Sequence, residues 1–219
     1  VVLNGRSNKN LKISKKNLGN VKTIAGDVTN KKNAQKIANK FYKEIGDIDI
    51  LICNVGSGRV NKKLHLLDGD WNISFKNNFF STSNMIEVFK KSLIKKKGCV
   101  ICISSICGIE HIPGAPFSYS IAKNSLNTYI KHLSKLFGKY DVRINGIAPG
   151  NIIHDNSVWK KKIKENPKKI KKFLKEEVSL RKFGKPEDVA SLTVFLASKN
   201  ASFITGSVVV IDGGQLRNV

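Results

Sequence analysis

The sequence predicts an α/β fold, in which helices cover both faces of a parallel sheet. Short runs rich in Val and Ile alternate with segments whose apolar residues recur at helical spacing, which is the pattern of strand–helix–strand units. The runs are apolar almost throughout, as expected for strands that are buried on both faces. Because no repeat, low-complexity linker or change in composition divides the 219 residues, we expect a single domain.

Strands and helices are expected to alternate along the whole chain. The strands, with the turns that end them, are expected at 1–7, 21–28, 48–56, 99–104, 142–150 and 208–214. The helices are expected in the lysine-rich stretch after the first strand and around 34–41, 68–94, 117–137, 157–178 and 186–196. Thr29 or Asn30 is suited to cap the second helix. Asn166-Pro167 interrupts the helical pair at 157–178, and Pro186 opens the last helix.

The charge of the chain bears on its partners. The formal net charge is +23, but only five of the 39 basic residues are Arg. Proteins that read nucleic acids depend on Arg for bidentate contacts, so we expect no specific nucleic-acid partner. A polyanion binder without sequence preference stays open as an alternative. No apolar run approaches the roughly 20 residues of a membrane helix, so we expect no membrane association.

The four cysteines predict reduced thiols rather than a metal site. Cys99 and Cys102 have the spacing of half a zinc site, but they lie within a β-branched run. Positions three apart in a strand face opposite sides and do not share a metal. We therefore expect no metal and an intracellular, reducing location.

Unusual residues gather where the predicted strands end. They are Asn4-Gly5-Arg6, Asp27, Asn54, Ser105 and Asn145 with Pro149-Gly150. The carboxyl ends of parallel strands form one rim, where α/β sheets bind ligands. Tyr119 and Lys123 follow with i, i+4 spacing, which places them on one face of a helix. A phenol, an ammonium and the Ser105 hydroxyl at one rim indicate a proton-transfer site.

Six motifs, in this order, resemble those of the classical short-chain dehydrogenase/reductase family. They are Asn54-Val-Gly56, Asn78 after Trp71, Ile103-Ser-Ser105, Tyr119-Ser-Ile-Ala-Lys123, Arg143-Ile-Asn-Gly-Ile-Ala-Pro149-Gly150 and Ile204-Thr-Gly with Val210-Ile-Asp-Gly-Gly214. The resemblance covers essentially the whole chain. It implies a Rossmann-like doubly wound parallel sheet and an NAD(P)-dependent oxidoreductase that acts on an alcohol or a carbonyl group.

The resemblance implies four catalytic residues. Tyr119 would exchange a proton with the substrate oxygen while hydride moves between nicotinamide and the carbonyl carbon. A free tyrosine titrates near pH ~10, and the ammonium of Lys123 is expected to lower the pKa of Tyr119. Ser105 would stabilise charge on the substrate oxygen. Asn78 would hold a water in the proton relay to Lys123, and its neighbour Asn77 is a rival for this role.

The cofactor residues implied by the resemblance lie along the same rim. They are Arg6, Asp27, Asn54, Gly56, Tyr119, Lys123, Pro149, Gly150 and Ile152. Asp27 corresponds to the residue that meets the adenine amino group, or it is only a turn cap. Arg6 suits the 2′-phosphate of NADP, so NADP is favoured and NAD stays possible. Cys53 and Val55 depart from the family's usual Asn-Asn-Ala-Gly turn.

The family's first strand, its Thr-Gly-x-x-x-Gly-x-Gly turn and the following helix do not occur in this sequence. That turn normally holds the pyrophosphate. We therefore expect an N-terminally incomplete chain: one domain over 1–219 that lacks this strand, turn and helix. Within it, 151–180 is expected to form the substrate lid. A cytoplasmic location is expected, and organellar targeting stays open.

The sequence does not distinguish between two classes of substrate. The resemblance allows a 3-oxoacyl-carrier-protein reductase or a sugar-modifying reductase of polysaccharide biosynthesis, hence a small or a carrier-bound carbonyl compound. Lysines between 160 and 175 would attract an anionic partner, or they form a solvated helix face. A catalytically silent binding subunit is a further alternative. Family members pack through the helices at 70–94 and 117–137, so a dimer or tetramer is expected.

Overall fold

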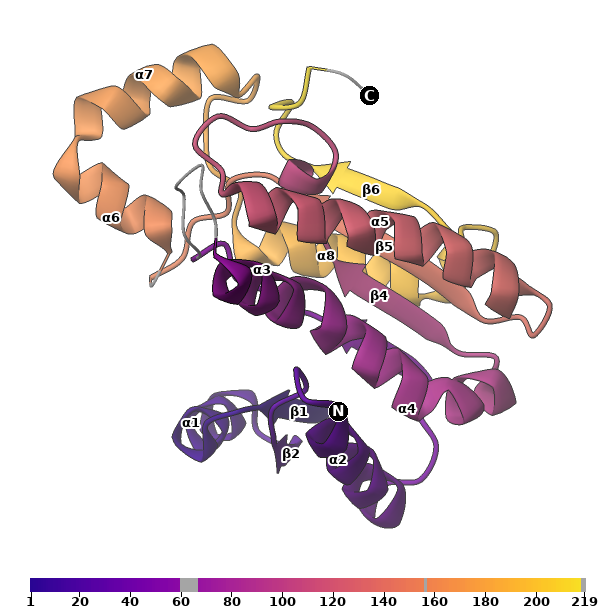
Figure 1. Cartoon of the computed structure of the whole chain (residues 1–219). Coiled ribbons are helices and arrows are strands. Elements are labelled where there is room, and N and C mark those ends of the chain that lie inside the picture. Colours follow the sequence, from indigo (N-terminus) through magenta and orange to yellow (C-terminus); the bar gives the residue numbers. More distant parts are fainter. Residues whose placement is uncertain (60–66, 156, 218–219) are drawn as a thin grey trace.

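The computed structural model describes residues 1–59, 67–155 and 157–217 (Figure 1). Its strands are β1 (Val2–Gly5), β2 (Lys22–Ala25), β3 (Ile50–Cys53), β4 (Cys99–Ile103), β5 (Arg143–Pro149) and β6 (Val208–Ile211). Its longer helices are α1 (Asn8–Leu18), α2 (Lys31–Glu44), α3 (Asp68–Phe75), α4 (Ser81–Lys96), α5 (Phe117–Gly138), α6 (Val158–Glu165), α7 (Pro167–Glu177) and α8 (Pro186–Ala197). Three short elements are a π-helical turn η1 (Lys76–Phe80) and the 3-10 turns η2 (Ile106–Gly108) and η3 (Lys199–Ala201).

All strand pairs are parallel, as predicted. One sheet has the order β3-β4-β5-β6, and β1 pairs with β2 in a second, two-stranded sheet. In the larger sheet Cys53 lies opposite Cys102, and Ile101 lies opposite Asn145. The helices that connect parallel neighbours return the chain to the same end of the sheet each time, so the carboxyl ends of β3, β4 and β5 lie side by side.

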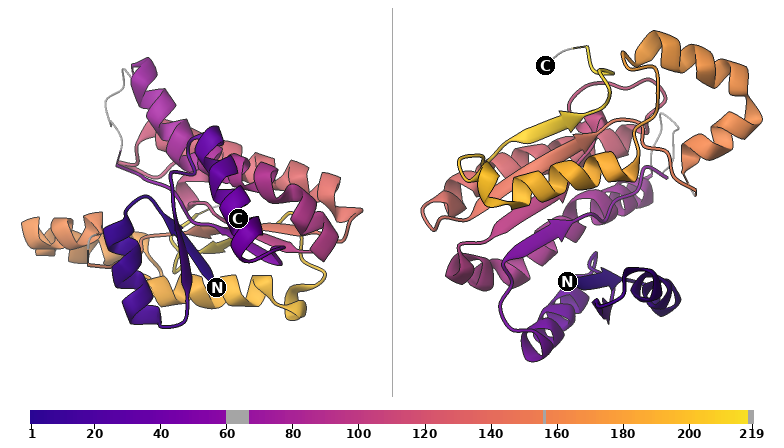
Figure 2. Two further views of the ribbon diagram at one scale, coloured as in Figure 1. Left: turned by 90° about the horizontal axis from the view of Figure 1, so that it is seen from below. Right: turned by 180° about the vertical axis from the view of Figure 1, so that it is seen from behind.

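Apolar residues of the larger sheet pack into a core on each of its faces. Helices α4 and α5 lie over one face, and α8 lies over the other (Figures 1 and 2). On the first face Val100 and Ile144 belong to the same cluster as Phe89 and Ile130. On the other face a smaller cluster comprises Cys99, Ile101, Ile147, Leu196 and Ala201. Burial on both faces explains why these strands are apolar throughout.

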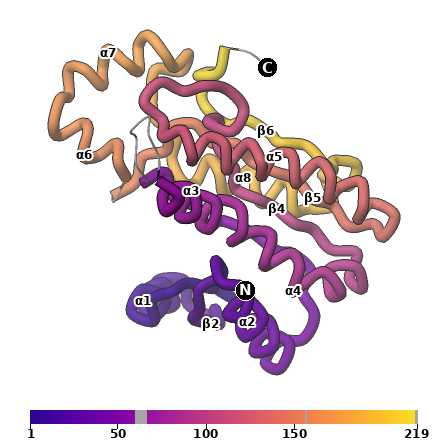
Figure 3. Tube along the Cα trace, in the orientation of Figure 1, coloured from indigo at the N-terminus to yellow at the C-terminus, as the bar shows by residue number. Residues whose placement is uncertain are grey.

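The two sheets are joined by a contact between α2 and α4. The ring centroids of Phe41 and Phe89 are 5.1 Å apart, and the Tyr42 ring is 5.5 Å from that of Phe89. The Tyr42 hydroxyl donates to the Val88 carbonyl at 3.2 Å, and the Asn84 amide donates to the Val28 carbonyl at 3.0 Å. Ile24 and Ile37 belong to the same buried cluster as Leu51 of β3 and Met85 of α4, and Figure 3 shows β1, β2, α1 and α2 together on the side of the molecule next to α4.

The edges of β1 and β3 have no strand partner on the side where they face each other, among the described residues. Ile50 and Ile52 of β3 are 45% and 49% exposed, although they lie within an apolar strand. Leu51 and Cys53, which point to the opposite face, are buried. A strand edge of this kind presents unpaired N–H and C=O groups.

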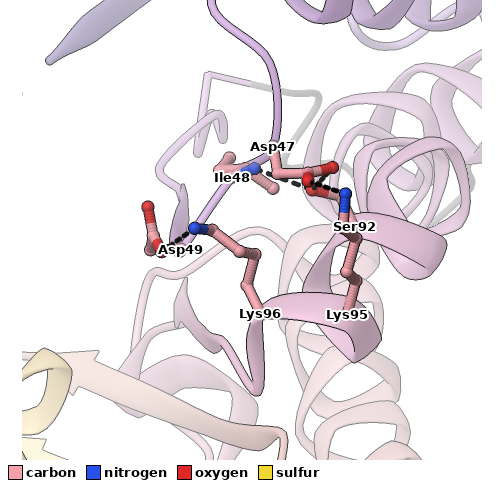
Figure 4. A network of polar contacts seen from close by, with 6 residues as sticks. All are labelled: Asp47, Ile48, Asp49, Ser92, Lys95 and Lys96. Atoms are coloured by element: carbon pink, nitrogen blue, oxygen red, sulfur yellow. Dashed lines mark hydrogen bonds and ion pairs between the residues drawn. The ribbon is translucent and has the colours of Figure 1, made fainter.

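A polar network fixes the start of β3 against the end of α4 (Figure 4). The Ser92 hydroxyl accepts from the backbone N–H of Ile48 at 2.7 Å and donates to the Asp47 carboxylate at 3.2 Å. Lys95 pairs with Asp47 at 2.6 Å, and Lys96 pairs with Asp49 at 3.4 Å. The short loop that enters the central sheet is thereby held in place.

The predicted continuous helix at 68–94 is interrupted in the structure. It comprises α3, the π-helical turn η1 and α4, which ends at Lys96. The wide turn contains Asn78, whose side chain makes tertiary hydrogen bonds that are described below. The break at Asn166-Pro167 between α6 and α7 is as predicted, and the Asn166 side chain accepts from the Lys169 N–H at 2.9 Å.

Candidate active site

Ser105 stands just beyond the carboxyl end of β4 in extended conformation, with φ −167° and ψ 152°. Its hydroxyl accepts from the Cys107 N–H at 3.2 Å and so caps the turn η2. Turn η2 packs closely on α5, because a Cβ on Gly108 would lie 2.6 Å from the Lys123 carbonyl carbon. The side chains of Asn124 and Asn127 both donate to the Gly108 carbonyl at 3.0 Å. This contact sets the position of Ser105 relative to α5.

Tyr119 and Lys123 lie one turn apart on α5, as predicted. The Ser105 hydroxyl is close enough to the Tyr119 phenol to influence its pKa, which places this face of α5 next to the end of β4. Lys123 is only 2% exposed, and its Nζ donates to the carbonyl oxygen of Ile103 at 2.7 Å. The phenol, the ammonium and the hydroxyl therefore meet at the carboxyl end of β4.

Burial sets the pKa of both groups. It raises the pKa of Tyr119 to about 12, while the Ser105 hydroxyl acts in the opposite direction. It lowers the pKa of Lys123 to about 8, because the charged form loses its hydration. The expectation that Lys123 lowers the pKa of Tyr119 is wrong for this structure. The Lys123 ammonium is itself desolvated and directed at the Ile103 carbonyl, and loss of water dominates at Tyr119.

Asn78 holds the turn that follows β3. It is fully buried, and its Oδ1 accepts from the Ser57 N–H at 2.8 Å. Its Nδ2 donates to the carbonyl oxygens of Ser57 and Ser74, both at 3.0 Å. The Asn78 side chain thus binds both the N–H and the C=O group of Ser57. The rival Asn77 is partly exposed and accepts from the Ser81 hydroxyl through its carbonyl, so the geometry favours Asn78.

Two glycines of this turn lie against the catalytic side chains. A Cβ on Gly56 would lie 3.1 Å from both Asn78 Oδ1 and Lys123 Nζ, which leaves little room for a side chain. A Cβ on Gly58 would lie 3.9 Å from the Tyr119 ring. The backbone at 56–58 therefore lies beside the predicted catalytic side chains, and its glycines leave room for close approach by a ligand. Asn54, in contrast, is exposed.

Asp27 and Arg6 are close together at the ends of β2 and β1. The Asp27 carboxylate accepts from the Thr29 N–H at 2.9 Å, so it is also a turn cap. Burial acts to raise the pKa of Asp27, but the hydrogen bonds from Thr29 and the charges of Arg6 and Lys76 outweigh it and lower the pKa. These two residues belong to the two-stranded sheet and lie apart from the Ser105 group.

Pro149, Gly150 and Ile152 follow the end of β5. The Gly150 N–H donates to the Ile211 carbonyl at 2.9 Å. A Cβ on Gly150 would lie 2.7 Å from that of Asp212, so only glycine fits there. Ile152 forms a parallel bridge with Gly184, at the base of the α6–α7 pair. The predicted cofactor residues are thus spread along the rim, on both sides of the catalytic group.

Sequence reasoning did not identify Gly108 or Asn127 as residues that shape the site. Asn127 accepts a 2.5 Å hydrogen bond from the Ser104 hydroxyl, next to Ser105. Its spacing of one turn from Lys123 was the only signal in the sequence that could have pointed to it.

Among the described residues no cluster of His, Cys, Asp and Glu side chains suits a metal ion, and no helix of these residues is long and apolar enough to cross a membrane.

Comparisons with known proteins agree over nearly the whole chain. A family profile described as enoyl-(acyl carrier protein) reductase matches residues 1–215. The 3-oxoacyl-[acyl-carrier-protein] reductase of Rickettsia typhi is 33% identical over an alignment of 220 positions, which covers 99% of this chain and 86% of the relative. Glucose 1-dehydrogenase 2 of Bacillus subtilis is 28% identical and covers 94% of this chain and 78% of the relative.

Solved structures share the fold. L-sorbose reductase from Gluconobacter frateurii, complexed with NADPH and L-sorbose, has a TM-score of 0.91 at 23% identity and covers 100% of this chain and 87% of that protein. An NADPH-bound short chain oxidoreductase from Pseudomonas aeruginosa has a TM-score of 0.91 at 22% identity, and the match covers 100% of this chain and 88% of that protein.

The lowered pKa of Lys123 makes stability depend on pH. Between about pH 8 and 10.5 the folded chain has lost this proton and the unfolded chain has not, so the free energy of unfolding rises with pH. We expect Lys123→Met to gain stability over the wild type at pH 7. This gain should shrink by at most about 1.4 kcal/mol per pH unit between pH 8 and 10, as measured by urea unfolding.

The exposed Lys135 of the same helix provides the control for this experiment. Lys135→Met should show a difference from the wild type that does not change over the same pH range. A pH-independent difference for Lys123→Met as well would show that the buried ammonium does not titrate in this window.

Proposed function

This chain belongs to the classical short-chain dehydrogenase/reductase family, and we propose that it is an NADP-dependent oxidoreductase that reduces a carbonyl group or oxidises a secondary alcohol. The observation that carries the proposal is the meeting of Ser105, Tyr119 and Lys123 at the end of β4, next to the buried Asn78. A phenol within reach of a hydroxyl and beside a buried amine is an acid–base group rather than a packing motif.

In the proposed reaction, the bound nicotinamide supplies or accepts the hydride. Tyr119 gives its proton to the substrate oxygen in the direction of reduction. Burial raises the pKa of this phenol to about 12, so the phenol is protonated at neutral pH but is a weaker acid than a free tyrosine, and the transfer depends on stabilisation of the phenolate that forms. Ser105 donates a hydrogen bond to the same oxygen and stabilises its developing charge. Lys123 would return a proton to the phenol, and Asn78, which lies beside Gly56 together with Lys123 Nζ, would hold a water in this relay.

Several residues of this chain fit the cofactor. Gly56 and Gly58 leave bare backbone beside Lys123 and Tyr119, where a nicotinamide ribose would lie. Arg6 is exposed at the end of β1 and beside Asp27, so its guanidinium is free to meet a 2′-phosphate. The NADPH in two structural neighbours supports the same choice. We assign Asp27 to the adenine, and Asn54, Pro149, Gly150 and Ile152 to the walls of the cofactor site.

The substrate class is a carbonyl compound that is small or carried by a protein. Several relatives bear the name 3-oxoacyl-[acyl-carrier-protein] reductase, which favours an acyl substrate. Glucose dehydrogenase and sorbose reductase among the relatives favour a sugar as the second candidate. We propose that 1–219 act as one domain and that 151–180 form the lid. Trp159 braces this lid by stacking on Phe173 at 5.3 Å, beside Phe183 at 5.0 Å.

We also propose a homo-oligomer in the cytoplasm. Large apolar side chains are exposed along the outer faces of α3, η1 and α5: Ile73, Phe80, Phe117 and Leu136. An exposed stripe on two neighbouring helices fits a second copy of the same surface. The four cysteines are all free thiols, in keeping with a reducing compartment.

Replacing Tyr119 tests the chemistry. We expect Tyr119→Phe to lower kcat by roughly 10²- to 10⁴-fold, because the proton donor is lost, while NADPH still binds. Consumption of NADPH with small ketones, sugars and acyl thioesters measures kcat, and quenching of protein fluorescence measures binding. Tyr140→Phe, which changes an exposed tyrosine, should behave like the wild type. Equal rates for all three proteins would favour a silent binding subunit.

Replacing Arg6 tests the choice of cofactor. Arg6→Ala should raise the KM for NADPH by about tenfold or more and leave the KM for NADH nearly unchanged, because only NADPH carries the 2′-phosphate. Lys9→Ala, on the neighbouring helix α1, is the matched loss of one positive charge. A parallel rise in both KM values for Arg6→Ala would contradict contact with the phosphate.

Charges on the exposed apolar stripe test the oligomer. Phe80→Glu combined with Phe117→Glu should shift the sedimentation coefficient to that of a smaller species, since two carboxylates would be buried at the contact. Leu18→Glu changes an exposed apolar residue on α1 and should not alter sedimentation. Oligomers of unchanged size in the double variant would place the contact elsewhere.

A further inference from the structure

The segment after β6 folds into a rigid turn at Asp212–Arg217. The Asp212 carboxylate accepts from three backbone N–H groups, those of Gly214 at 2.8 Å, Gln215 at 3.1 Å and Leu216 at 2.8 Å. Gly213 and Gly214 have φ values of 70° and 77°, in the region that favours glycine. The reaction proposed above uses none of these residues.

This turn binds the end of the lid where the chain returns from α7. The Leu180 N–H donates to the Gly213 carbonyl at 2.9 Å, and the Ser179 hydroxyl donates to the Gly214 carbonyl at 2.9 Å. Figures 1 and 2 show the segment after β6 beside the end of α7. One lid end is thus held by backbone atoms of the turn.

The same turn binds the start of the lid. The Asn151 Nδ2 donates to Gln215 Oε1 at 2.6 Å, and Gln215 is only 8% exposed. The start of the lid also pairs with the chain just beyond its end, because the Gly184 N–H donates to the Asn151 carbonyl at 3.0 Å and the Ile153 N–H donates to the Gly184 carbonyl at 2.8 Å. Both ends of the lid therefore depend on Asp212–Arg217.

A third link reaches the loop that follows Ser105. The Arg217 N–H donates to the Glu110 carboxylate at 3.1 Å, and the Arg217 guanidinium pairs with the Glu177 carboxylate at 2.9 Å. Glu110 lies five residues beyond Ser105, and Glu177 is the last residue of α7. Arg217 therefore joins the loop on the substrate side of the catalytic serine to the lid.

We propose that Asp212–Arg217 is a latch that positions the lid over the catalytic group, with Gln215 as its main positioning residue and Arg217 as a minor one. Gln215 matters more because its hydrogen bond is largely buried, and loss of it leaves the Asn151 amide without a partner. The Arg217–Glu177 pair is exposed and contributes little by itself. The kinetic part of this inference rests on the proposed reductase function.

Two variants of Gln215 test the latch in the full chain. Gln215→Met keeps the length of the side chain but has no acceptor for Asn151, whereas Gln215→Glu keeps an acceptor oxygen. We expect amide hydrogen exchange at Leu180 and Ile153 to become about tenfold faster in Gln215→Met, as for one lost buried hydrogen bond. Gln215→Glu should restore most of the protection. The KM of the carbonyl substrate should rise several-fold in Gln215→Met, with kcat within about twofold.

Lys172→Ala is the matched control, because it removes an exposed ion pair with Glu176 from α7 without touching the latch. It should leave both exchange and KM unchanged. Unchanged exchange at Leu180 and Ile153 in Gln215→Met would overturn the latch, as would an equal rise at Val100 in the core strand β4. Faster exchange confined to the lid, in a protein without any reductase activity, would support the latch and reject the proposed function.

Discussion

The hydrogen bond from Lys123 to the Ile103 carbonyl is the contact on which the rest of the site depends. It fixes α5 to the last residue of β4 through a cation that is almost fully buried. Tyr119 lies one turn before this cation, and Ser105 lies two residues beyond the carbonyl. Gly56 packs directly against Nζ. A lysine in this position costs stability because its charge is desolvated, and this cost is consistent with a functional role.

Desolvation acts in opposite directions on the two titrating groups. It raises the pKa of the Tyr119 phenol and lowers that of the Lys123 ammonium, because in both cases the charged form is the one that loses hydration. Burial keeps the phenol protonated and at the same time makes it a weaker acid, because the phenolate is the form that loses hydration. Beside these two groups, the bare backbone at Gly56 and Gly58 leaves room for close approach by a ligand.

The alternation of apolar strands and helices was sufficient to predict the parallel sheet, and the motif order was sufficient to predict the family. The Tyr119–Lys123 spacing also predicted their common helix face. The π-helical turn at Asn78 was not predictable, because its cause is a tertiary bond to Ser57. The pKa of Tyr119 was predicted in the wrong direction, because the extent of desolvation follows from packing. The catalytic and cofactor-binding roles predicted for the site residues remain predictions.

The packing of α2 on α4 has a consequence for cooperativity. Phe41 and Tyr42 of α2 contact Phe89 of α4. Ile24 and Ile37 also belong to the same buried cluster as Leu51 of β3. The unit that carries Arg6 and Asp27 therefore shares a hydrophobic core with the larger sheet, so opening of this unit would expose apolar surface of that core to water.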